Sequence, residues 1–107
     1  MKTVTICGSM RYAAQMPGIA LELELRHGFN VLQCVYNPEN IPLSPEDVQV
    51  LSRAHLRKID LSDAIYVVDI DGYIGQSVAE EIAYARERGK GVIFHREFKD
   101  GTTTWIR

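Results

Sequence analysis

Glu81 is the residue of this chain that is best placed to do chemistry. It lies in a segment with helical spacing, where Val78 and Ile82 fall on one apolar stripe, Glu81 lies at the edge of that stripe and Glu80 points away. Burial raises the pKa of a carboxylate held against apolar surface and the helix dipole lowers it, a balance that catalysis can exploit. A solvated glutamate that only stabilises the start of the helix fits the same letters.

The stretch before this helix is a strand followed by polar residues. Residues 65–68 form a short apolar run rich in β-branched side chains, which is typical of a strand buried on both faces of a parallel sheet. We therefore expect it near the sheet centre, with its carboxyl end at the edge where open α/β sheets bind ligands. The candidate ligand contacts that follow it are Asp69, Asp71, Gly75 and Ser77.

A second stretch suited to chemistry follows the first predicted strand, residues 2–7. Gly8, Ser9, Met10 and Arg11 form a turn before a helical segment and offer backbone N–H groups, a hydroxyl and a guanidinium to an anion such as phosphate. The turn has neither of the common glycine-rich nucleotide motifs, and a plain β-to-α turn fits equally well. Met10 is a candidate pocket residue, although methionine more often fills a core.

Length and composition predict one globular domain over residues 1–107, with 46% hydrophobic and 24% charged residues. The chain is small for an enzyme, so we expect a homodimer. A net charge of -2 argues against binding to duplex nucleic acid, which requires a basic surface, but it allows a nucleotide-sized ligand.

The cysteines and histidines do not have the spacing of a metal site. Cys7 and Cys34 each end an apolar run, and His27, His55 and His95 are far apart, so we expect core thiols, no metal and no cofactor. The chain shows no signal-like start and no apolar run of membrane length, which predicts a cytoplasmic protein without membrane contact.

Strands and helices alternate along the chain. This order predicts a three-layer α/β sandwich of Rossmann or flavodoxin type, with a mainly parallel sheet of four to five strands. The tail, residues 97–107, has too little pattern to assign. The expected strands are 2–7, 29–36, 65–68 and 92–94, and the expected helices are 13–26, 45–61 and a third that ends before Gly89. Ile19, Leu21, Leu23 and Leu25 are expected to pack from the first helix, and Val48, Leu51, Leu56 and Ile59 from the second.

The two chemical stretches together resemble the nucleoside 2-deoxyribosyltransferase superfamily, including its deoxynucleoside 5'-monophosphate N-glycosidase branch. Residues 7–11, CGSMR, are similar to a strand-end element whose serine and arginine hold the 5'-phosphate, and residues 81–85, EIAYA, to an element whose glutamate attacks the anomeric carbon. The resemblance covers residues 2–96 in order and phase. It implies that Glu81 is the nucleophile and that Ser9 and Arg11 are phosphate or sugar ligands.

The chain departs from this family pattern at two positions. His55 stands where the family has an aspartate, and Thr5 stands where it has a tyrosine of the first strand. The resemblance implies that His55 supplies general acid or base catalysis, with Asp69 or Asp71 as substitutes.

These residues are compatible with three functions. The first is an N-glycosidase or deoxyribosyltransferase that acts on a nucleoside or nucleoside 5'-monophosphate. The second is a nucleotide-binding module without catalysis. The third, a phosphoacceptor receiver domain that uses Asp69, is weak because Gly8 and Ser9 stand where it needs an acidic pair.

Overall fold

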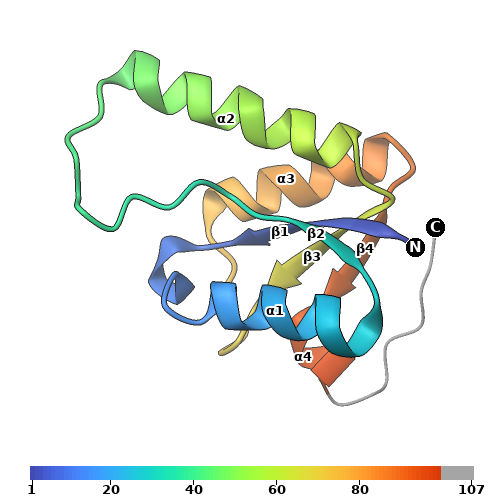
Figure 1. Ribbon diagram of the computed structural model, residues 1–107. Coiled ribbons are helices and arrows are strands. Elements are labelled where there is room, and N and C mark those ends of the chain that lie inside the picture. The colour runs from blue at the N-terminus through green and yellow to red at the C-terminus, as the bar shows by residue number, and fades with distance from the viewer. Residues whose placement is uncertain (100–107) are drawn as a thin grey trace.

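The computed structural model describes residues 1–99 and has the predicted three-layer architecture (Figure 1). Its strands form one parallel sheet in the order β2-β1-β3-β4. Helices α2 and α3 cover one face, and α1 and α4 cover the other. In chain order the elements are β1 (Thr3–Gly8), η1 (Met10–Tyr12), α1 (Met16–His27), β2 (Asn30–Leu32), α2 (Pro45–Asp60), β3 (Ala64–Val68), α3 (Gln76–Glu87), β4 (Gly91–Phe94) and α4 (His95–Lys99).

The central strand β3 is buried along its whole length, as its apolar run predicts. Successive side chains of a strand point to opposite faces, so the sheet separates two cores. Tyr66 and Val68 of β3 belong to the core under α1, whereas Ile65 and Val67 belong to the core under α2 and α3. Cys7 of β1 faces this second core, and it is only 1% exposed.

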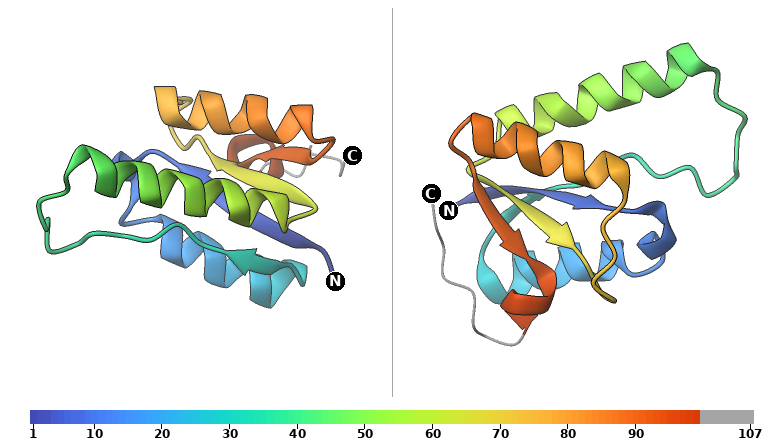
Figure 2. Two further views of the ribbon diagram at one scale, coloured as in Figure 1. Left: turned by 90° about the horizontal axis from the view of Figure 1, so that it is seen from above. Right: turned by 180° about the vertical axis from the view of Figure 1, so that it is seen from behind.

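The second strand is much shorter than expected. The prediction of a strand over 29–36 was wrong, because β2 pairs with β1 only from Asn30 to Leu32. Beyond Leu32 the chain leaves the sheet and arches outward before it returns as α2 (Figure 2). The last three residues of β1 therefore pair with β3 alone.

The first helix begins later and buries less than its sequence suggests. The expected start at Ala13 was wrong, because the α-helix begins at Met16 with a proline in its first turn. Leu23 is buried as expected, but Leu21 and Leu25 are 60% and 75% exposed. Leucines spaced two apart cannot all face the core of a helix with 3.6 residues per turn.

The second helix begins as predicted, with a capping box between Ser44 and Asp47. Its packing was predicted only in part. Ile59 is fully buried, whereas Val48 and Leu51 are 52% and 39% exposed, because the N-terminal half of the helix reaches beyond the sheet.

The end of the described chain forms α4, directly after β4. Nδ1 of His95 lies 2.6 Å from the hydroxyl of Tyr66, on the α1 face of the sheet. Trp105, with the rest of the tail after residue 99, lies outside the described residues. None of the helices that the structure describes is long and apolar enough to span a membrane.

Candidate active site

A cavity of about 610 Å³ lies between α2, α3 and the turn after β1. Its size is in the range of pockets for small molecules. Seven of the predicted site residues line it: Gly8, Ser9, Met10, His55, Gly75, Ser77 and Glu81. No sequence motif pointed to the other lining residues, which are Cys34, Val35, Val48, Leu51, Ser52, Leu56, Lys58, Tyr73, Gln76, Val78, Glu80 and Tyr84.

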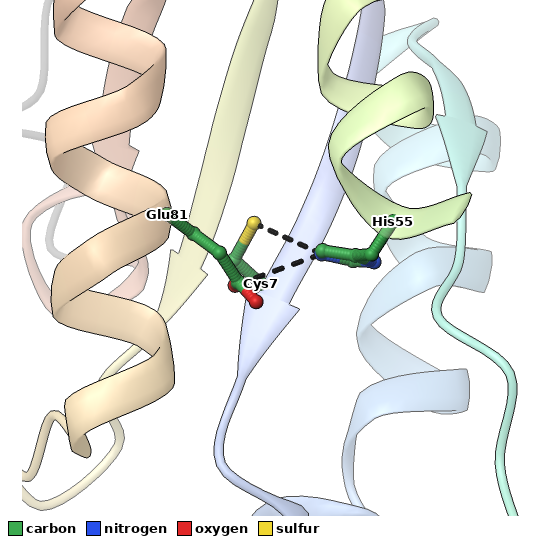
Figure 3. A group of neighbouring side chains, drawn as sticks. All are labelled: Cys7, His55 and Glu81. Carbon is green, nitrogen blue, oxygen red and sulfur yellow. Dashed lines mark hydrogen bonds and ion pairs between the residues drawn. The ribbon is translucent and has the colours of Figure 1, made fainter. Parts of the chain in front are cut away.

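Glu81 and His55 face each other across this cavity (Figure 3). Nε2 of His55 lies 3.6 Å from Oε1 of Glu81, and the two side chains are 12% and 20% exposed. Glu81 lies at the edge of the buried stripe formed by Val78 and Ile82, as its helical phase predicted. Sγ of Cys7 lies 3.4 Å from the same Nε2 atom, so three polar side chains from three elements meet at one point.

Burial acts against both charges of the facing pair. It raises the pKa of Glu81 to about 7, opposed by a hydrogen bond from Cys7 and assisted by the charge of Glu80. It lowers the pKa of His55 to about 4, and the charge of Lys58 acts in the same direction. The separation is that of an ion pair, but these pKa values leave the imidazole neutral at neutral pH. We therefore describe the pair as sharing one proton between about pH 4 and about pH 7.

Cys7 is a neutral thiol in this environment. Burial raises its pKa well above the ordinary value, and the neighbouring Glu81 adds to this. The thiol can therefore donate a hydrogen bond to the carboxylate, but it is not activated as a nucleophile.

The turn after β1 forms one end of the cavity. The side chain of Ser9 caps η1 by accepting a hydrogen bond from the backbone N–H of Arg11 at 3.2 Å. A side chain at Gly8 would place its Cβ 2.7 Å from Sδ of Met16 and 3.0 Å from Cβ of Val68, so the close packing of this turn requires glycine.

Three predicted site residues do not line the cavity. The guanidinium of Arg11 stacks at 3.6 Å on the ring of Tyr73, which does line it, so Arg11 lies beside its rim. Asp69 is buried, and its Oδ1 accepts a hydrogen bond from the backbone N–H of Arg96 at 3.0 Å. Asp71 is exposed, and its backbone N–H contacts the hydroxyl of Tyr12.

Thr5 is fully buried, and the hydrogen bonds of its hydroxyl hold the fold together. Its hydroxyl lies 2.6 Å from that of Ser62 and donates to the carbonyl of Lys58 at 3.0 Å. These contacts join β1 to the C-terminal end of α2.

The chain matches no protein-family model, and no curated protein matches its sequence. Among solved structures, it is similar to the CMP N-glycosidase BcmB of Clostridium botulinum, with a TM-score of 0.57 and 19% identity over 87% of this chain and 70% of that one. It is also similar to a conserved protein from Enterococcus faecalis V583, with a TM-score of 0.60 and 17% identity over 88% of this chain and 62% of that one. This chain thus spans less than two thirds of the second protein. At these identities the likeness shows the fold alone. The chain shares the α/β fold of these two proteins, as its alternation of strands and helices predicted.

Proposed function

We propose that the protein cleaves the N-glycosidic bond of a nucleoside 5'-monophosphate or nucleoside, with Glu81 as the nucleophile. The observation that carries the proposal is the half-buried carboxylate of Glu81, 3.6 Å from His55, in a cavity that also contains the Gly8-Ser9 turn. The shared fold with a CMP N-glycosidase supports this class of reaction.

In the proposed reaction an oxygen of Glu81 bonds to the anomeric carbon while the bond from that carbon to the base breaks. The reactive form of the pair has its one proton on His55 and the charge on Glu81. The electron pair of the broken bond moves to the base nitrogen, which takes this proton from His55. Water, or a second base, then displaces Glu81 from the sugar, and His55 accepts the proton of the incoming group. A nearby carboxylate also stabilises the positive charge that develops on the sugar.

The binding groups of the proposal lie at the ends of the cavity. Ser9 and Met10 contribute the turn after β1, whereas Gly75 and Ser77 contribute the start of α3. Gly75 caps this helix without a side-chain hydrogen bond, which leaves room for a ligand near its first N–H groups. A 5'-phosphate at the rim would be within reach of Arg11 if its guanidinium turned from the ring of Tyr73.

We also propose that the protein is a homodimer whose second subunit covers the N-terminal half of α2 and the loop before it, beside the cavity. Six large apolar residues of this helix half and of the loop before it are exposed in one subunit: Val35, Ile41, Leu43, Val48, Val50 and Leu51. Val35, Val48 and Leu51 also line the cavity. Exposed apolar residues in such a group are typical of a protein–protein interface. A monomer by light scattering at working concentration would contradict this assignment.

The experiment that tests the function is incubation with a panel of nucleosides and 5'-monophosphates, with chromatographic detection of free base. Release of base supports the N-glycosidase. Saturable binding in calorimetry without release would instead favour the nucleotide-binding module. If no nucleoside or monophosphate of the panel releases base or binds, both functions are contradicted.

A further inference from the structure

The side chains of Cys7, His55 and Glu81 form a cluster of metal-ligand type inside the protein (Figure 3). They come from β1, α2 and α3, and their ligand atoms all lie within 4.8 Å of one another. The thiol is buried, and the imidazole and the carboxylate both line the cavity. Thiolate, imidazole and carboxylate are the three ligand types that Zn²⁺ takes from proteins.

Two of the three separations within the cluster are close to the edges of a tetrahedral zinc site. With bonds of about 2.3 Å to sulfur and about 2.0 Å to nitrogen and oxygen, tetrahedral angles place sulfur and nitrogen about 3.5 Å apart, and nitrogen and oxygen about 3.3 Å apart. The distances here are 3.4 Å from Cys7 Sγ to His55 Nε2 and 3.6 Å from that Nε2 to Glu81 Oε1. An ion could therefore enter with shifts of a few tenths of an ångström along these two edges.

We propose that Cys7, His55 and Glu81 bind a thiophilic divalent cation, for which Zn²⁺ is the best fit, with a fourth position open toward the cavity. The thiol proton passes to solvent as the thiolate bonds to the metal. Lys58 on the cavity wall opposes a cation there, whereas Glu80 on the facing helix favours it. Three protein ligands and one open position are the arrangement of zinc sites that exchange their fourth ligand.

The site would also regulate turnover, a consequence that rests on the proposed function. A metal bound to Glu81 and His55 occupies both the nucleophile and the proton donor of the N-glycosidase. Binding of Zn²⁺ and base release are then mutually exclusive, and a chelator restores release. The metal site itself is independent of this consequence, because its test needs no substrate.

The test is titration of the full chain with Co²⁺, which replaces Zn²⁺ and absorbs light. We expect one equivalent to give the near-ultraviolet band of a cobalt–thiolate bond and the visible bands of four-coordinate Co²⁺, and we expect Zn²⁺ to remove both. Cys7→Ser should lose the thiolate band. His55→Gln should weaken binding at least about 10-fold, since even outer-shell partners cost that much.

Two variants serve as matched controls. Cys34→Ser removes the other cysteine, and His27→Gln removes a histidine on the opposite side of the sheet, so both should keep the bands and the affinity. Absence of a thiolate band in the unmodified protein would overturn the proposal, as would a band that survives Cys7→Ser and disappears with Cys34→Ser. If Cys7→Ser does not fold by circular dichroism, His55→Gln decides, because it leaves the buried thiol in place.

Discussion

Nε2 of His55 on α2 lies 3.6 Å from Oε1 of Glu81 on α3, so the two groups best suited to acid–base work come from facing helices. Neither group can be positioned by its own helix alone. Their separation depends on how α2 packs against α3 and against the end of β1. Chemistry at this site is therefore sensitive to changes that shift one helix relative to the other.

Glu81→Gln should reduce base release by more than about 10²-fold, because it removes the charge that stabilises the transition state while nearly preserving shape. Nucleotide affinity should change little, so the loss belongs to the chemical step. Glu80→Gln is the control, since this exposed neighbour also lines the cavity, but its carboxylate accepts a hydrogen bond from Gln76 and has no recorded contact with His55. Single-turnover rates and calorimetry separate the two effects, and equal activity of both variants would remove Glu81 from the reaction.

The rate of base release should depend on pH as a bell with limits at about 4 and about 7. Below the lower limit both His55 and Glu81 hold protons, and no carboxylate is available to attack. Above the upper limit the pair has lost its last proton, and none remains for the leaving base. The profile should be measured with a chelator present. A rate that continues to rise above pH 8 would show that this pair supplies no proton.

His55→Gln should lower the rate and abolish the fall at high pH, because the only group proposed to donate the proton is gone. His55→Asp restores a titratable group, and we expect it to recover part of the rate with a profile of changed shape. His27→Gln, on the far face of the sheet, should leave the profile unaltered. The same profile in His55→Gln as in the unmodified protein would assign proton transfer elsewhere.

Arg11→Ala should weaken 5'-monophosphates by roughly 10- to 150-fold, since a hydrogen bond to a charged group contributes about 1.5 to 3 kcal/mol. Unphosphorylated nucleosides should lose much less. Arg26→Ala removes an arginine that pairs with Glu22 on the surface, and it should affect neither ligand. Dissociation constants for a matched nucleoside and monophosphate provide the comparison. Equal losses for both ligands would mean that Arg11 acts only through its stacking on Tyr73.

Ile59→Ala should lower the free energy of unfolding by about 2 to 5 kcal/mol, because this side chain is fully buried. Val48→Ala on the same helix should change it by less than about 0.5 kcal/mol at concentrations where the protein is a monomer, because Val48 is 52% exposed in one subunit. In the proposed dimer, which covers Val48, the loss should be larger. Urea denaturation of the two variants provides the measurement. Similar losses at both positions would mean that the outer half of α2 is covered in solution.

Sequence patterns predicted those features of the fold that depend only on residues close together in the chain. The apolar run before Asp69 and the helical phase of Glu81 each depend on a few neighbouring residues, and both are found as expected. The early end of β2 was not predictable, because residues 33–36 have the pattern of a strand and only the pairing with β1 shows where the strand ends. The contact of Cys7 with His55 was not predictable either. The two residues lie 48 positions apart, on β1 and α2, and only the fold brings them together.

Within one subunit, the described contacts of the second helix with the sheet and α3 come from its middle and its C-terminal end. Its C-terminal end is joined to the sheet through Ile59 and the buried Thr5–Ser62 contact, whereas its N-terminal end is stabilised by its own capping box at Ser44. Protection of its amide hydrogens from exchange should therefore fall from the last turn toward the first. A ligand that bridges α2 and α3 would order the least stable part of the helix, and some of its binding free energy would be spent on that ordering.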